Sequence, residues 1–220
     1  AFSYMKEYSH YGAAYKGFVV EDNVFVPSPM EDFPADNPHQ MMLKVRGHVR
    51  DLVFDDTYAY LDKSLKFRIN RLFVYTILRG IAFIINRIYY GLRIEGRKNL
   101  YRNRHLLRNG AVTICNHIGR WDMIAVLQAT LHTFWIPMYR NSFMGKDGYL
   151  MKHVGGIPVP EDIRGLKCFT KAFDELHERK QWIHIFPESC SWKFYSPVRP
   201  FKIGAFNMAY KYNLPIIPCV

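Results

Sequence analysis

The segment NHIGRWD holds the residue pair best suited to chemistry in this sequence. His117 and Asp122 are five residues apart, between an apolar run typical of a buried strand (111–116) and a run with helical periodicity (121–131). Turns between a strand and a helix commonly carry functional side chains in α/β proteins. A histidine held by a carboxylate is suited to act as a general base. The carboxylate fixes the tautomer and stabilises the imidazolium that forms when a hydroxyl proton is removed.

The spacing of this pair sets the local structure that it requires. On one continuous helix, side chains five positions apart diverge by about 140°. Contact therefore requires His117 in the turn and Asp122 in the first turn of the helix, and Gly119 provides the backbone freedom of a tight turn. The spacing alone also fits a simpler interpretation, in which Asp122 only caps the helix and His117 is incidental.

Other reactive side chains lack the context that chemistry needs. Cys190 has no activating neighbour in the sequence, which favours an inert thiol over a nucleophile. His184 lies in the apolar run 181–186 and is expected in the interior. His153 and His177 lack the spacing of metal ligands to each other or to carboxylates, so no metal site is predicted.

Strands and helices are expected to alternate around the central motif. Strands are predicted at 92–96, 111–116, 181–186 and 214–220, and helices at 121–131, 161–180 and 204–213. This alternation favours an α/β fold with a mostly parallel central sheet flanked by helices, over residues 93–220. A chain of 220 residues can form one sizeable core and an appendage.

A long amphipathic helical segment is predicted before this domain, over residues 55–92, with Asp56 or Thr57 as its start signal. A helical wheel places on one side Arg68, Arg71, Arg79, Asn86 and Arg87, and on the other Phe73, Val74, Ile77, Leu78, Ile81, Ile84, Ile85 and Ile88. Such a helix can lie in a membrane interface, with its cations on headgroups and its apolar face in the acyl region. The pattern equally fits a helix packed on a core with a basic, solvated edge. The polar residues within 72–90 argue against a confident transmembrane assignment.

Residues 1–54 are predicted to form an irregular N-terminal arm, because four prolines lie between Val26 and Pro38. The arm opens without the apolar region of a signal peptide. A formal net charge of +11 suits an anionic surface, either acidic lipid or nucleic acid. The four cysteines have no CxxC spacing, which favours a reducing, cytosolic environment.

Four blocks occur in a characteristic order: NHIGRWD, GGIPVP, IFPES and LPIIPCV. In this order and spacing the chain resembles the lysophospholipid acyltransferase family, which includes the 1-acylglycerol-3-phosphate acyltransferases, over about residues 68–220. The family pattern is NHxxxxD, a Gly- and Ile-containing block that normally ends in Arg, FPEGTR, and a vPxxP strand. The resemblance implies that His117 is the base, Asp122 its partner, and Glu188 a contributor to acceptor binding or to site architecture. It further implies substrate-binding roles for Asn116, Gly156, Ile157, Pro187, Ser189, Lys193 and Lys202.

Two departures from the family pattern concern the acceptor. Ser191 and Pro160 stand where the family usually has phosphate-contacting arginines, and neither replaces the paired hydrogen bonds of a guanidinium. Cations nearby in the sequence that could substitute are Arg164, Lys193, Arg199 and Lys202. Without such a substitute, the acceptor is expected to be a lyso-lipid that has no phosphomonoester beside the hydroxyl.

The resemblance also implies the partners and the location. The donor is expected to be acyl-CoA or acyl-carrier protein, the acceptor a lysophospholipid, and no cofactor is needed. The chain is expected at the cytoplasmic face of a membrane, as a peripheral or monotopic protein. A non-catalytic membrane-surface protein on the same scaffold is the alternative. Nucleic-acid binding is not expected, because only the net charge favours it.

Overall fold

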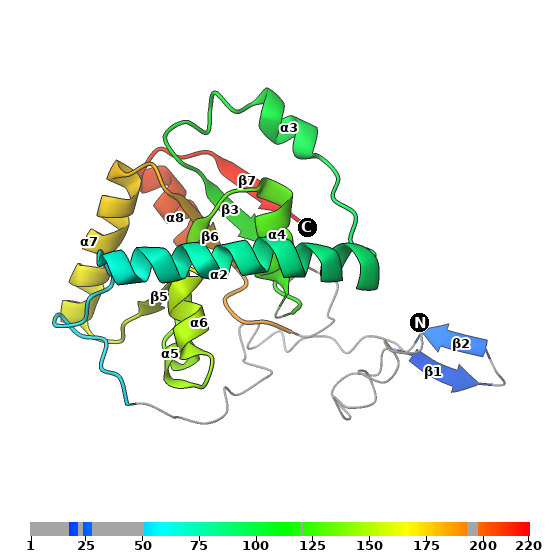
Figure 1. Cartoon of the computed structure of the whole chain (residues 1–220), viewed down its shortest axis with the longest axis horizontal. Helices are drawn as coiled ribbons and strands as arrows, with labels where there is room; N and C mark the ends of the chain where they lie inside the picture. The colour runs from blue at the N-terminus through cyan, green and yellow to red at the C-terminus, as the bar shows by residue number, and fades with distance from the viewer. Residues whose placement is uncertain (1–17, 22–23, 28–50, 120, 193–197) are drawn as a thin grey trace.

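The computed structural model describes residues 18–21, 24–27, 51–119, 121–192 and 198–220. Its largest unit is a five-stranded sheet of order β5-β4-β6-β3-β7 (Figure 1). The strands are β3 (Val112–Cys115), β4 (Phe134–Tyr139), β5 (Gly156–Val159), β6 (Trp182–Ile185) and β7 (Ile216–Cys219). Every pairing within this sheet is parallel, which confirms the predicted α/β fold.

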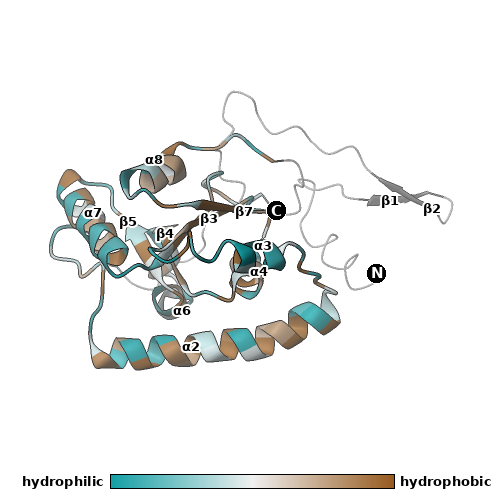
Figure 2. Ribbon diagram, turned by 90° about the horizontal axis from the view of Figure 1, so that it is seen from above, coloured by the Kyte–Doolittle hydropathy of each residue, from teal (hydrophilic) through white to brown (hydrophobic). Residues whose placement is uncertain are grey.

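Helices cover both faces of the sheet (Figures 1 and 2). They are α2 (Leu65–Ile84), which continues as the π-helical turn η2 (Ile85–Tyr89), α3 (Arg97–Arg102), α4 (Asp122–Thr130), α5 (Asn141–Met144), α6 (Gly148–His153), α7 (Ile163–Glu178) and α8 (Gly204–Lys211). The described part of the N-terminal arm contains the antiparallel strands β1 (Phe18–Glu21) and β2 (Val24–Pro27). The predicted arm therefore includes one pair of short antiparallel strands.

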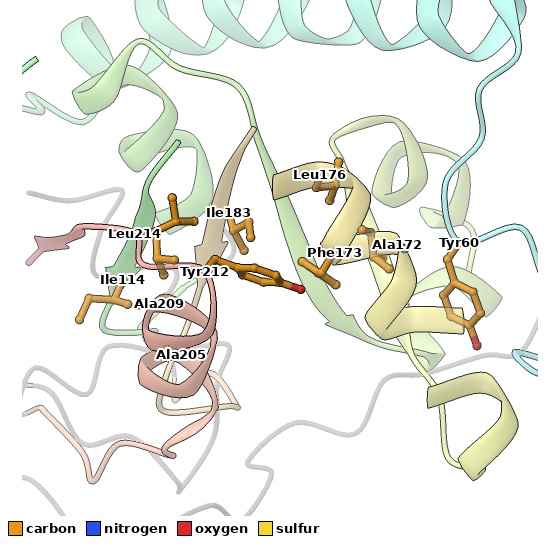
Figure 3. Close-up of a cluster of buried hydrophobic side chains, with 12 residues drawn as sticks. Tyr60, Ile114, Ala172, Phe173, Leu176, Ile183, Ala205, Ala209, Tyr212 and Leu214 are labelled. Atoms are coloured by element: carbon orange, nitrogen blue, oxygen red, sulfur yellow. The ribbon is translucent and has the colours of Figure 1, made fainter. Parts of the chain in front are cut away.

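The hydrophobic core lies on both faces of the sheet. On one face, α7 and α8 pack against β3 and β6 through residues that include Phe173, Leu176, Ala205 and Ile183 (Figure 3). On the other face, a second cluster joins α2 and α4 to β4 and β6. All four residues of β3 are buried, as expected for a parallel strand covered on both sides. The loops at its two ends are consequently fixed by a rigid strand.

Helix α2 turns its polar side toward the domain. The hydroxyl of Tyr75 donates to the carbonyl of Val154 at 2.7 Å, Nη2 of Arg71 donates to the carbonyl of Phe134 at 3.1 Å, and Nη2 of Arg79 donates to that of Leu131 at 2.9 Å. In η2, the buried Asn86 donates to the side chain of Gln128 at 3.0 Å.

Most of the predicted apolar arc faces outward, where large side chains remain exposed: Phe73 66%, Ile81 57%, Ile84 56% and, in η2, Ile88 78%. Val74, Leu78 and Ile85 of the same arc are half-buried. The helix packs on the core through Tyr75 and Leu78, but most of its apolar arc does not. The guanidinium groups of Arg71 and Arg79 also donate to backbone carbonyls of the domain and help to dock the helix on it. Arg68 and Arg87 remain exposed.

Three predicted elements differ from the structure. Residues 92–96 form no strand and instead line a cavity described below. The strands β4 and β5 were not predicted. Helix α2 begins at Leu65, capped by Ser64, and not near Asp56, because the Asp55 carboxylate accepts the N–H and the hydroxyl of Thr57 and closes a local turn.

Candidate active site

The motif NHIGRWD connects the end of β3 to the start of α4 (Figure 1). Strand β6 lies beside β3 and runs parallel to it, with Thr113 opposite His184. The segment that follows β6, from Phe186 to Trp192, therefore emerges at the same edge of the sheet as His117. Parallel pairing thus brings together two motifs that are about seventy residues apart in the sequence.

His117 and Asp122 are in contact. Nδ1 of His117 lies 2.9 Å from Oδ2 of Asp122. The same oxygen accepts the backbone N–H groups of Ile118 and Gly119, each at 2.8 Å. Asp122 therefore pairs with the histidine and binds the loop that carries it. It does not cap α4, because the cap residue is Trp121 and has no side-chain hydrogen bond.

This contact determines which nitrogen of His117 can act as a base. An ionised carboxylate only accepts hydrogen bonds, so Nδ1 carries the proton in the neutral ring and Nε2 keeps its lone pair. Among the described residues, Asp122 is the hydrogen-bond partner of the His117 ring. The ring is stacked on Phe186 with centroids 3.9 Å apart and planes at 15°. His117 is partly accessible, with its side chain 23% exposed.

Glu188 makes the contacts of site architecture, one of the two roles that the resemblance implied. Its side chain is 1% exposed. Its carboxylate accepts the backbone N–H of His117 at 2.8 Å, the backbone N–H of Arg199 at 2.8 Å and Nη2 of Arg199 at 2.8 Å. Burial at this level removes the carboxylate from solvent.

The other residues expected to bind substrate differ in their burial and in their surroundings. Asn116 is half-buried and lines the cavity described below. Ser189 is exposed and has φ 66°, a left-handed conformation that suits the glycine of the family pattern better than serine. Pro187 is buried, and its carbonyl accepts the N–H of the exposed Lys202 at 2.8 Å. Lys193 lies outside the described residues.

Gly156 and Ile157 lie in β5, at the opposite edge of the sheet from β7. Ile157 is 0% exposed and belongs to the hydrophobic core. A Cβ at Gly156 would come within 2.6 Å of the carbonyl oxygen of Met151, so glycine is needed there for packing. For both residues, the structure supports a structural role in place of the expected contact with substrate.

The cations proposed as substitutes for the missing arginines differ in their exposure to solvent. Arg164 is exposed at the start of α7, whereas Arg199 is 2% exposed. Arg199 is paired with Glu188 and is not available to a phosphate group in solution. The pairing of Arg199 with Glu188 could not be inferred from the sequence, because no local pattern identifies an arginine that pairs with a residue eleven positions earlier.

A cavity of about 830 Å³ lies beside the His117 loop, and it is lined by Asp122 but not by His117 itself. Asn116, Ile118 and Asp122 form the part of its wall nearest the pair. Leu92, Leu107, Ala125 and Ile217 are among the apolar residues of its other walls. Its volume and mostly apolar lining are those of a site for a small organic ligand or a lipid chain. No periodicity in the sequence predicts this cavity, because the residues come from α4, β7 and the segment 92–107.

Comparison with protein-family models matches residues 91–220 to the family described as Acyltransferase. The chain belongs to the acyltransferase family. A comparison with curated proteins found no match. In this acyltransferase, the matched region begins directly after η2 and includes the His117 loop, the Glu188 segment and the whole five-stranded sheet.

Two buried groups near the site have shifted pKa values. Burial, with a smaller contribution from His117, lowers the pKa of His184 to about 3. Burial, with a smaller contribution from the charge of Asp122, raises the pKa of the Cys115 thiol to about 12. The acyltransferase thus keeps an uncharged histidine and an uncharged thiol close to the His117 loop at neutral pH. Within the described residues, no group of His, Cys, Asp and Glu side chains has the arrangement of a metal site.

Proposed function

We propose that this acyltransferase transfers a fatty acyl group from a thioester to the hydroxyl of a lysophospholipid at a membrane surface. The observation that carries the proposal is the contact of 2.9 Å between Nδ1 of His117 and Oδ2 of Asp122, because Asp122 also lines a mostly apolar cavity of about 830 Å³. The first feature suits removal of a hydroxyl proton. The second suits an acyl chain.

In the proposed reaction, Nε2 of His117 takes the proton of the acceptor hydroxyl as its oxygen attacks the thioester carbonyl. Asp122 stabilises the imidazolium that forms, because its carboxylate is hydrogen-bonded to Nδ1. The tetrahedral intermediate then breaks its carbon–sulfur bond. The thiolate leaves and receives the proton from His117, so that the base is regenerated.

The cavity is proposed to hold the acyl chain. Transfer of each methylene group from water to an apolar wall contributes about 0.8 kcal/mol, which favours long-chain donors. The donor is acyl-CoA or acyl-carrier protein, since either supplies the thioester and suits a protein with a net charge of +11. No cofactor is required, because the thiolate is itself a good leaving group.

Membrane contact is proposed to occur through the outward face of α2 and η2. Leu65–Tyr89 is long and apolar enough to cross a membrane, and only 22% of its apolar window is buried. The bonds from Arg71 and Tyr75 to the sheet domain hold this helix along the side of the domain (Figure 2). A helix held in this way favours a position in the membrane interface over a transmembrane one.

Aromatic residues near the cavity support the same orientation. Tyr89, Tyr90 and Trp121 are 65%, 45% and 45% exposed, and Tyr90 and Trp121 line the cavity. Amphipathic rings of this kind favour the headgroup level of a bilayer. We therefore propose that the acyltransferase is a peripheral or monotopic membrane protein with its cavity near the lipid. The cytoplasmic face is proposed on the resemblance alone.

The acceptor is proposed to be a lysophospholipid such as 1-acylglycerol-3-phosphate, or a lyso-lipid without a phosphomonoester. Ser191 and Pro160 lack the charge that the family uses for phosphate, and Arg199 is buried. Lys202 is exposed and is joined by its backbone to Pro187, beside Glu188. Among the described cations considered as substitutes, Lys202 is thus the best placed to meet an acceptor headgroup.

The test uses the full chain, a long-chain acyl-CoA, and vesicles that contain either lysophosphatidate or lysophosphatidylcholine, with release of free thiol as the measurement. We expect transfer to at least one acceptor, and its loss in His117→Ala with folding and vesicle binding unchanged. His105→Ala, at an exposed histidine, is the matched control and should retain full activity. Full turnover by His117→Ala would overturn the proposal. Vesicle binding without turnover of any thioester would favour the non-catalytic alternative.

A further inference from the structure

A buried ion pair lies next to the backbone of the proposed base. Nη2 of Arg199 is 2.8 Å from Oε2 of Glu188, and both side chains are 1% exposed. The guanidinium also lies over the ring of Trp192, 5.3 Å from its centroid. A buried pair is tolerated only when other hydrogen bonds satisfy both partners. The positions of those hydrogen bonds indicate what the pair does.

Both members of the pair hold the peptide groups of His117. Oε2 of Glu188 accepts the His117 N–H at 2.8 Å. The carbonyl of His117 accepts the N–H of Trp192 at 3.1 Å, and Nη2 of Arg199 lies at a longer distance of 3.4 Å from the same oxygen. The backbone of the base is thereby held on its N–H and on its C=O by the segment that follows β6.

Arg199 also closes this segment on itself. Its backbone N–H donates to Oε1 of Glu188 at 2.8 Å, and Nη2 donates to the carbonyl of Cys190. Ser191 carries no charge at the position where the family pattern has arginine. A guanidinium nevertheless reaches this motif, from Arg199, which comes later in the sequence.

We propose that Arg199 is a positioning residue of the acyl-transfer reaction, which fixes His117 by pairing with Glu188 and by binding the carbonyl of His117. Arg199 does not bind the acceptor phosphate, because its side chain is buried. This inference rests on the proposed function. It predicts that loss of the guanidinium lowers kcat and leaves KM for the acceptor unchanged.

The test compares Arg199→Gln, Arg199→Lys, Glu188→Gln and the double variant Glu188→Gln/Arg199→Gln. Arg199→Gln alone leaves a buried carboxylate without its counter-charge, so its thermal stability should fall. The double variant removes both charges and should fold as well as Glu188→Gln. We expect kcat of the double variant to be about 100-fold below that of the unmodified chain, since small displacements of a reacting group have costs of this order.

Partial rescue of kcat is expected in Arg199→Lys, which keeps the charge but not the paired donors of the guanidinium. The matched control is Arg140→Gln, because Arg140 forms an exposed pair with Glu161 at 2.6 Å. This control should keep kcat within twofold. A rise of acceptor KM at constant kcat in Arg199→Gln or in the double variant would overturn the proposal, because it would make Arg199 an acceptor ligand. An unchanged kcat in a folded double variant would overturn it as well.

A second readout does not depend on turnover. The Nδ1 proton of His117, in its hydrogen bond to Asp122, should give a downfield resonance in the proton NMR spectrum that His117→Ala removes. We expect this resonance to shift or broaden in the double variant and to stay unchanged in Arg140→Gln. If the unmodified chain shows the resonance but has no turnover, the proposed function fails while the positioning of His117 is still tested. An identical resonance in the folded double variant would count against Arg199 as a positioning residue.

Discussion

Oδ2 of Asp122 lies 2.9 Å from Nδ1 of His117. The same oxygen binds the N–H groups of Ile118 and Gly119. One atom therefore shapes the loop and orients the ring that the loop carries. This arrangement links local folding to the proposed chemistry, because a change at Asp122 affects the tautomer of His117 and the turn in which His117 sits.

Asp122→Asn should separate these two effects. The amide oxygen of asparagine can still accept the loop N–H groups, but the neutral side chain cannot stabilise the imidazolium or enforce the productive tautomer. We expect kcat to fall by about 10³ to 10⁴ with little change in the thermal unfolding temperature. Asp162→Asn is the control, because Asp162 caps α7 through the N–H of Gly165 at 2.6 Å. A fall in kcat of less than tenfold in Asp122→Asn would contradict the assigned role.

The outward face of α2 gives a prediction about membranes. Phe73→Asp with Ile84→Asp places two charges on side chains that are 66% and 56% exposed. We expect the double variant to lose co-sedimentation with vesicles while its unfolding temperature is unchanged, because the two side chains contribute little to the core. The control is Ile163→Asp on α7, at a side chain that is 83% exposed. Equal losses of vesicle binding in both variants would argue against a specific membrane-binding face.

The cavity gives a prediction about acyl-chain length. Ala125 of α4 lines the cavity, so Ala125→Phe should shorten the space that remains for an acyl chain. Each methylene group that no longer fits costs about 0.8 kcal/mol, or about fourfold in kcat/KM. We expect the preference for palmitoyl-CoA over octanoyl-CoA to fall by at least about tenfold, as measured with both donors in parallel. The control, Ala59→Phe at an exposed alanine, should keep the preference.

The sequence predicts the strands correctly where apolar runs have clear boundaries. It does not predict them where tertiary packing decides which residues form a strand. Strand β3 is buried on both faces and reads as a continuous apolar run. Strand β4 contains Pro137, which in a sequence argues against a central strand. The ladder from β4 to β6 involves only Phe134 and Trp135, so Pro137 lies beyond the end of that ladder. Residues 92–96 have the composition of a strand but form a cavity wall.

For the candidate site, the sequence indicates the residue types better than their contacts. The spacing of His117 and Asp122 is compatible with their pairing, but the order of the four sequence blocks is what indicates it. The placement of Arg199 against Glu188 depends on how two separate loop segments fold together, which periodicity does not encode. The same limitation explains Ile157, whose apolar character fits a lipid site and a core equally well, and whose burial places it in the core.

The pH dependence of stability should depend on His184. Its ring is fully buried, with Nδ1 2.8 Å from the Thr113 hydroxyl oxygen, and burial lowers its pKa from 6.5 to about 3. Between these two pH values the unfolded chain takes up a proton that the folded chain does not, so stability decreases as the pH falls. The contribution approaches about 1.4 kcal/mol per pH unit.

Replacement of this histidine isolates its contribution. Urea unfolding at several pH values between 7 and about 4 should give a steeper loss of stability in the unmodified chain than in His184→Gln. The variant is expected to be less stable at pH 7, because a fully buried side chain is replaced, but its stability should vary less with pH. His105→Ala changes an exposed histidine and should keep the slope of the unmodified chain. Equal slopes in His184→Gln and the unmodified chain would show that His184 does not resist protonation in the folded state.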